Sequence, residues 1–162
     1  MLASVNDAIL QKLLNCWPVA RLATVSAAGL PHAVPIVFVV EGVHLYSPID
    51  GKLKNGTPLK RIRNIEENPA VTLLLDDYHD DWQQLWWVRL DGEAELHVPD
   101  ASVSRLLEKL LRTKYPQYEE GTLLPRDAHY LRITWRQGAA WAQSGYPAHI
   151  IGQAIDRLAI PA

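Results

Sequence analysis

The chain has 162 residues, of which 48% are hydrophobic and 21% are charged. These proportions are typical of a globular domain and exclude a disordered tail, a collagen-like repeat or a coiled-coil rod. Its 16 basic and 18 acidic residues give a formal net charge of -2, which argues against a protein that depends on bulk nucleic-acid electrostatics.

The N-terminal residues lack the basic and apolar regions of a secretory signal, so we expect a cytoplasmic protein. The longest apolar run, residues 33–40, is far shorter than the roughly 20 residues of a membrane helix, which argues against a membrane partner. The single cysteine, Cys16, excludes an internal disulfide and lies in an apolar helix stripe typical of a core position. We expect one domain over residues 1–162.

Residues 1–17 are predicted to form an N-terminal helix, because apolar side chains recur there at helical spacing. Three strands are expected next, over residues 21–26, 31–40 and 43–47, and their short connections predict an antiparallel meander. Pro35 cannot donate to a ladder, so it indicates a bulge, an edge or a cleft in the second of these strands.

Positive charges gather in the following loop and helix start. Five cations lie within residues 52–63 with no acid among them: Lys52, Lys54, Lys60, Arg61 and Arg63. Thr57 is a candidate N-cap and Pro58 suits the first helical position. Free N–H groups at a helix N-terminus favour an anion, so this segment is a candidate phosphate site. A solvated basic loop is the alternative, and both interpretations stay open on these residues alone.

Residues 71–75 form a short apolar strand, and residues 86–98 show the clearest alternation of apolar and polar side chains in the chain. Asp91-Gly92 predicts a bulge or bend in this second segment. Trp87 shares the polar face with charged side chains, so core packing does not explain it. We therefore interpret Trp87 as a cleft or interface residue.

Asp100 is predicted to cap a second helix. Two strands, over residues 129–135 and 139–143, are expected to pair back across a turn at Gln137-Gly138. Residues 147–160 have the spacing of a terminal amphipathic helix. The pattern as a whole predicts a mainly β, antiparallel domain, a small closed barrel with helices packed around it.

Two histidines are candidates for binding a metal, a cofactor or a substrate. His79 lies among four aspartates, but the spacing fits no standard metal loop, so an exposed acidic turn is preferred and no metal site is predicted. His32 could donate a hydrogen bond to a cofactor or substrate, although a structural role is the simpler interpretation. No catalytic residues are assigned, because no Ser-His-Asp or Cys-His set can be assembled from the sequence.

Several segments together resemble the pyridoxamine 5'-phosphate oxidase-related family of flavin-binding split barrels. They are ARLATV at 20–25, Gly29 with Pro31-His32 and VPIVF at 34–38, GVHLYS at 42–47, LKRIRNI at 59–65, NPAVTLL at 68–74, and DW, LWWVR and DG within 81–92. The last group is similar to a branch described as probable coenzyme F420-dependent enzymes. The resemblance extends from about residue 15 to residue 141.

The resemblance implies a six-stranded antiparallel Greek-key split barrel with flanking helices, assembled as a homodimer that binds a flavin or deazaflavin between its subunits. FMN is the commoner ligand of such proteins, and F420 is the alternative that the branch favours. Six tryptophans in so short a chain agree with an extensive interface. The substrate would be an unidentified small molecule.

Residues can be carried over from the family pattern by position. The cofactor phosphate is implied to lie at Ser47, Lys60 and Arg61, and Lys52 adds charge in the same loop. The ring of the cofactor is implied to lie along Pro35, Ile36 and Val37. A glutamine that reaches the cofactor in the oxidases is replaced by Trp87, a departure that changes the ring environment.

Three classes of function follow. The first is an FMN- or F420-dependent oxidoreductase, in which the cofactor supplies the redox chemistry and the protein orients it. The second is a non-catalytic carrier or sensor that binds flavin or haem on the same fold. The third is a binder of single-stranded nucleic acid on a small barrel, and the acidic net charge argues against it.

Overall fold

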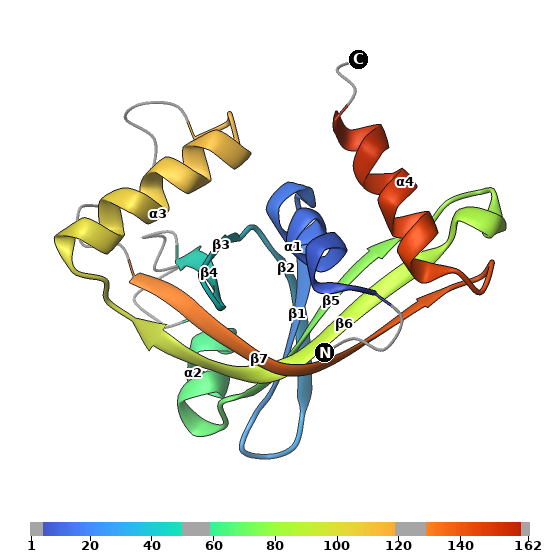
Figure 1. Ribbon diagram of the computed structural model, residues 1–162. Coiled ribbons are helices and arrows are strands. Elements are labelled where there is room, and N and C mark those ends of the chain that lie inside the picture. The colour runs from blue at the N-terminus through green and yellow to red at the C-terminus, as the bar shows by residue number, and fades with distance from the viewer. Residues whose placement is uncertain (1–4, 50–58, 119–128, 160–162) are drawn as a thin grey trace.

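The computed structural model describes residues 5–49, 59–118 and 129–159 (Figure 1). The strands are β1 (Ala20–Val25), β2 (Pro31–Ile36), β3 (Val39–Glu41), β4 (His44–Ile49), β5 (Ala70–Asp77), β6 (Trp86–His97) and β7 (His129–Ala142). The helices are α1 (Asp7–Cys16), α2 (Lys60–Glu67), α3 (Ala101–Lys114) and α4 (Pro147–Ala159), with a 3-10 turn, η2 (Trp82–Gln84). In this part of the chain, no helix has both the length and the apolar character needed to cross a membrane.

All seven of these strands belong to one antiparallel sheet with the order β2-β1-β5-β6-β7-β4-β3. The expectation of a closed six-stranded barrel is therefore wrong in strand number and in closure. The segment predicted as one strand over residues 31–40 forms both edges of the sheet. Its first part pairs with β1 and its last part with β4, so Val37 and Phe38 bridge the two edges covalently.

The backbone of Phe38 lies at this break and cannot enter either ladder. Tyr115, just after α3, replaces the missing partners. Its hydroxyl accepts a hydrogen bond from the Phe38 N–H at 2.9 Å. Its one proton can be donated to either of two carbonyl oxygens, that of Phe38 at 2.8 Å or that of Pro18 at 3.0 Å. Buried backbone groups need such partners, so this hydroxyl stabilises the strand break.

β6 and β7 form the longest ladder, and their register shifts between Asp91 and Gly92. The predicted bulge is confirmed. The turn predicted at Gln137-Gly138 is wrong, because β7 continues through these residues. Asp91 pairs with Gln137 and Gly92 with Trp135, which leaves Arg136 as the extra residue of the bulge.

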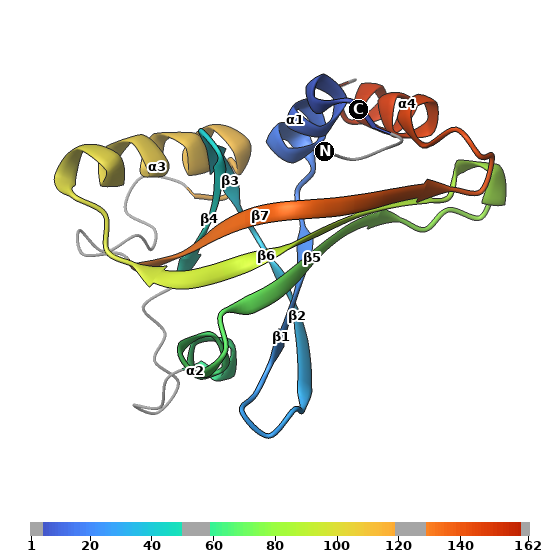
Figure 2. The same cartoon turned by 60° about the horizontal axis from the view of Figure 1, so that its bottom comes forward.

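The main core lies on the sheet face that α1 and α4 cover (Figure 2), and Ile65 of α2 belongs to the same cluster. Fully buried leucines from the helix and the sheet meet there: Leu13, Leu14, Leu22, Leu73 and Leu90. α3 packs near β3 and β4 through a second apolar cluster around Leu107 and Leu111. As predicted, Asp100 caps α3, accepting from the Ser102 and Val103 N–H groups.

Candidate functional site

The amino end of α2 concentrates positive charge. Lys60 and Arg61 occupy its first turn, which contains no acidic residue. The N-cap in the structure is Leu59, which makes no side-chain cap. Thr57 and Pro58, predicted as the N-cap and the first helical position, lie outside the described residues. Cations at a helix N-terminus oppose the helix dipole, which costs about 0.3–1 kcal/mol each. An anion bound at this end would interact favourably with both the cations and the helix dipole, and would offset this cost.

A chain of polar contacts fixes this helix end against the sheet. Ile62 and Ile65 bury the apolar side of α2. Between them, the buried Asn64 donates from Nδ2 to Thr24 Oγ1 on β1 at 2.9 Å. Thr24 Oγ1 in turn lies 3.4 Å from the His32 carbonyl oxygen on β2. The orientation of α2 is thus coupled to β1 and β2.

His32 experiences the charges of α2 directly. Burial lowers the pKa of His32 below its usual value, and the positive charges of Lys60 and Arg61 lower it further. Its Nδ1 atom is buried, and the described residues offer it no hydrogen bond. The electrostatic potential around the helix start is therefore positive, which suits a phosphate or carboxylate group.

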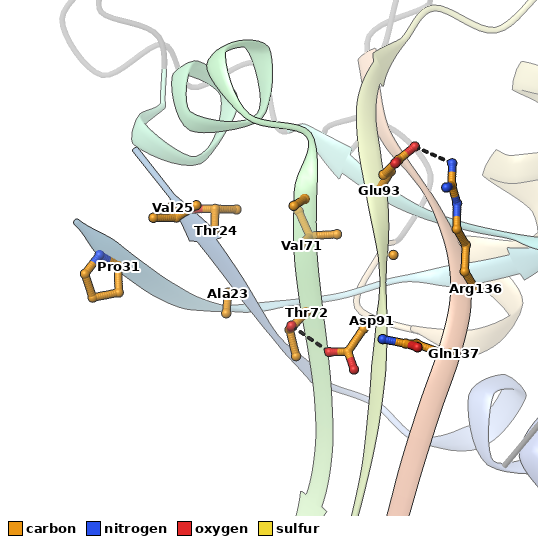
Figure 3. A pocket seen from close by; sticks show the side chains of 12 residues that line it. Ala23, Thr24, Val25, Pro31, Val71, Thr72, Asp91, Glu93, Arg136 and Gln137 are labelled. Carbon is orange, nitrogen blue, oxygen red and sulfur yellow. Dashed lines mark hydrogen bonds and ion pairs between the residues drawn. The ribbon is translucent and has the colours of Figure 1, made fainter. Parts of the chain in front are cut away.

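A groove of about 670 Å³ crosses the outer face of β1, β5, β6 and β7 (Figure 3). Thr24 contributes both to the groove and to the contact with α2. Two polar pairs lie along it: Thr72 Oγ1 donates to Asp91 Oδ1 at 2.8 Å, and Arg136 lies 2.7 Å from Glu93 Oε2.

Gly92 forms part of the groove wall because β7 passes very close to its backbone. A Cβ atom at this position would lie 2.1 Å from the Thr134 carbonyl oxygen, so no other residue fits without a shift of the strand. Sequence reasoning missed Arg136 and Glu93 as groove residues. The sequence signal for them is Gln137-Gly138. These residues are predicted as a turn, but they lie on β7 opposite the bulge at Asp91-Gly92.

Of the other residues assigned by resemblance, one group lies at the end of β2 and Ser47 lies on β4. Pro35 is exposed and Val37 is half-buried, whereas the Ile36 side chain belongs to the core and its backbone pairs with Ala20 on β1. Ser47 is buried on β4, between β3 and β7. Lys52 lies outside the described residues.

Trp87 lies at the other end of β6. Its ring stacks on Trp141, with centroids 6.5 Å apart and planes at 16°. The end of α2 meets β6 near Ala94, whose N–H donates to the Pro69 carbonyl at 2.8 Å. At about 3.3 Å per residue, Trp87 is roughly 20 Å along the strand from that point. Within one chain, Trp87 therefore lies far along β6 from the point where the carboxyl end of α2 meets the sheet (Figure 1).

Known proteins show what this architecture resembles. HutZ, the heme storage protein of Vibrio cholerae, has a TM-score of 0.65 and 18% identity over 85% of this chain and 94% of its own. A FAD-binding protein of Mesorhizobium loti has a TM-score of 0.60 and 24% identity over 84% and 94%. An F420 reductase has a TM-score of 0.55 and 21% identity over 79% and 94%. At these identities the likeness concerns the fold.

No curated protein matches the chain. A family model described as pyridoxamine 5'-phosphate oxidase matches residues 7–142, which contain all seven strands described above and helices α1 to α3. The chain therefore belongs to the pyridoxamine 5'-phosphate oxidase family.

Proposed function

We propose that this protein is an oxidoreductase that binds FMN, or alternatively F420, in a cleft between two copies of the chain. The observation that carries the proposal is the pair of cations in the first turn of α2, where the helix dipole disfavours them unless an anion is bound. Family membership supports a flavin as the source of that anion. Both FMN and F420 carry an anionic tail that fits this site.

In this proposal, Lys60 and Arg61 hold the anionic tail through charge-assisted hydrogen bonds, and the Ser47 hydroxyl adds a neutral donor. The exposed Pro35 and the half-buried Val37 border the ring. Lys52, which lies outside the described residues, would add positive charge. Trp87, roughly 20 Å along β6, would reach the cofactor from the other copy of the chain.

The cofactor would supply two-electron transfer to or from a small molecule. The chain's own contribution is to bind and orient it. The Asn64–Thr24 hydrogen bond sets the direction of α2, and the rigid ladder of β5, β6 and β7 provides the wall on which the ring and substrate lie.

Titration of the purified protein with FMN and with F420 tests the proposal, because each has a distinct visible absorbance. Arg61→Ala should weaken binding about ten- to a hundredfold, since a hydrogen bond to a charged group contributes roughly 1.5–3 kcal/mol. Arg63→Ala is the matched control, an exposed cation two residues further along the same helix. Equal affinities in wild type and Arg61→Ala, with the fold intact, would overturn the assignment.

A non-catalytic haem or flavin carrier is the second candidate, and the likeness to the heme storage protein HutZ favours it. The same titrations should then include haemin. Tight haemin binding without measurable FMN or F420 binding would favour the carrier. Reduction or oxidation of a bound FMN or F420 by a small-molecule substrate would favour the enzyme.

A further inference from the structure

A second cavity, of about 480 Å³, lies between α1, β3 and α3. These elements are separate from α2 and from the strands that line the groove described above (Figure 1). Val39 and Val40 provide an apolar wall, and Thr113 adds a hydroxyl group. Two potential nucleophiles also line it, Cys16 and Lys114.

The Lys114 amine is held in a defined position. Nζ donates a hydrogen bond to the Leu14 carbonyl oxygen in the last turn of α1 at 2.8 Å. It lies 3.6 Å from the centroid of the Phe38 ring and 5.5 Å from that of Tyr115. Nζ is thus held against protein groups, while the half-buried Lys114 side chain lines the cavity.

Burial changes the protonation of both nucleophiles. It lowers the pKa of Lys114 to about 7, although the Leu14 carbonyl and the Phe38 ring favour the charged amine. Burial also raises the pKa of the Cys16 thiol, against the opposing effect of the Lys114 charge. Among the described residues that line the cavity, these two are the titratable ones, with β3 contributing valines. At neutral pH the amine is the better nucleophile.

We propose that Lys114 is an imine-forming residue that takes a small aldehyde into this cavity. The amine nitrogen attacks the carbonyl carbon, and a new C–N bond forms. The carbonyl oxygen then leaves as water, with protons that come from the amine and the solvent, and a C=N bond remains. No oxidant or reductant takes part. The valine wall would hold the hydrocarbon part of the aldehyde.

The probe for this test is 2-hydroxybenzaldehyde, added to the full-length protein at pH 7. Borohydride reduces the imine to a stable amine, and peptide mass spectrometry locates it. Lys114 should react at least tenfold faster than Lys109, an exposed lysine on the same helix. Its rate should reach half of its maximum near pH 7, whereas an ordinary lysine requires about pH 10.4.

Three variants separate reactivity from structure. Lys114→Arg retains a cation that can contact the Leu14 carbonyl, so it should preserve the melting temperature and abolish the fast labelling. Lys109→Ala and Cys16→Ala should retain it. Labelling spread evenly over the exposed lysines, a half-maximal rate near pH 10, or unchanged fast labelling in Lys114→Arg would each overturn the proposal.

Discussion

The pKa of His32 responds to the charges at the proposed anion site. Its pKa is lowered by burial first and by Lys60 and Arg61 next. The neutral imidazole is therefore favoured where the two cations are unbalanced. A bound anion would oppose their field and favour the imidazolium form. Because binding and protonation are linked, any anion that raises this pKa must also bind more tightly as the pH falls through it.

We expect inorganic phosphate or FMN to raise the pKa of His32, as measured by NMR titration of its imidazole signals. Arg61→Ala should also raise the pKa in the ligand-free protein, because it removes one of the cations that lower it. Arg63→Ala should change it less, because Arg63 is not among the charges that lower the pKa of His32. A His32 pKa that does not respond to Arg61→Ala would show that the α2 cations do not act on this histidine.

Single residues also mark the limit of what the sequence predicts about the sites. Lys60 and Arg61 are candidates from the sequence because their charges cluster along the chain. Lys114 could not, since its hydrogen bond joins residues 100 positions apart. Tyr115 reaches the strand break at Phe38 across 77 positions, and nothing in the local pattern indicates that contact. Long-range packing determines the role of both residues.

The bulged ladder of β6 and β7 determines the shape of the groove. The bulge lets β7 cross close to Gly92 and leaves Arg136 beside Glu93 at the groove wall. The absence of a side chain at position 92 is a steric requirement, because the nearest β7 atoms are backbone and cannot rotate away. The glycine thus connects a local sequence feature to the architecture of the proposed site.

Gly92→Ala should lower the free energy of unfolding by about 1–3 kcal/mol, since the added methyl group overlaps the Thr134 carbonyl. Urea unfolding followed by circular dichroism measures this. Gly152→Ala is the matched control within α4, where an added Cβ meets nothing within 4 Å and alanine favours the helix by up to about 1 kcal/mol. Equal stabilities of Gly92→Ala and wild type would contradict the close approach.

Elements were predictable where local chemistry determines them. Asp100 caps α3 through N–H groups two and three residues ahead, and this signal is complete within the sequence. The division of residues 31–41 between two sheet edges depends instead on β1 and β4, which lie on either side of it in the chain. The continuation of β7 through Gln137 likewise depends on its partner strand. A short segment such as Gln137-Gly138 has the same composition in a turn and opposite a bulge, so the strand pairing is needed to distinguish the two.

At the scale of the whole molecule, the sheet is covered unequally. The face under α1 and α4 is closed by the core, but aromatic side chains remain accessible on the outer face where β5, β6 and β7 end. The Trp87–Trp141 stack lines a cavity of about 520 Å³ there together with Leu74 and Tyr78. Trp141 is 40% exposed and Tyr78 is 82% exposed. Exposed aromatic groups of this kind are typical of interface cores.

We expect the wild-type protein to have about twice the 18.2 kDa mass of one chain in light scattering at micromolar concentration. Trp87→Ala should shift that mass toward one chain and weaken cofactor binding, because loss of a central aromatic anchor costs about 2 kcal/mol or more, roughly thirtyfold in affinity. Val43→Ala, which shortens a side chain 67% exposed in the turn before β4, should leave both properties unchanged.

The Trp87→Ala variant must remain folded for this result to identify an interface. Trp87 is half-buried and lines an open cavity in the single chain, so its removal should change the near-ultraviolet circular dichroism without abolishing cooperative unfolding. A variant that loses its cooperative transition, while wild-type mass and cofactor binding persist up to that transition, would place Trp87 in the core of one chain. A wild-type mass of one chain at micromolar concentration would exclude the dimer outright.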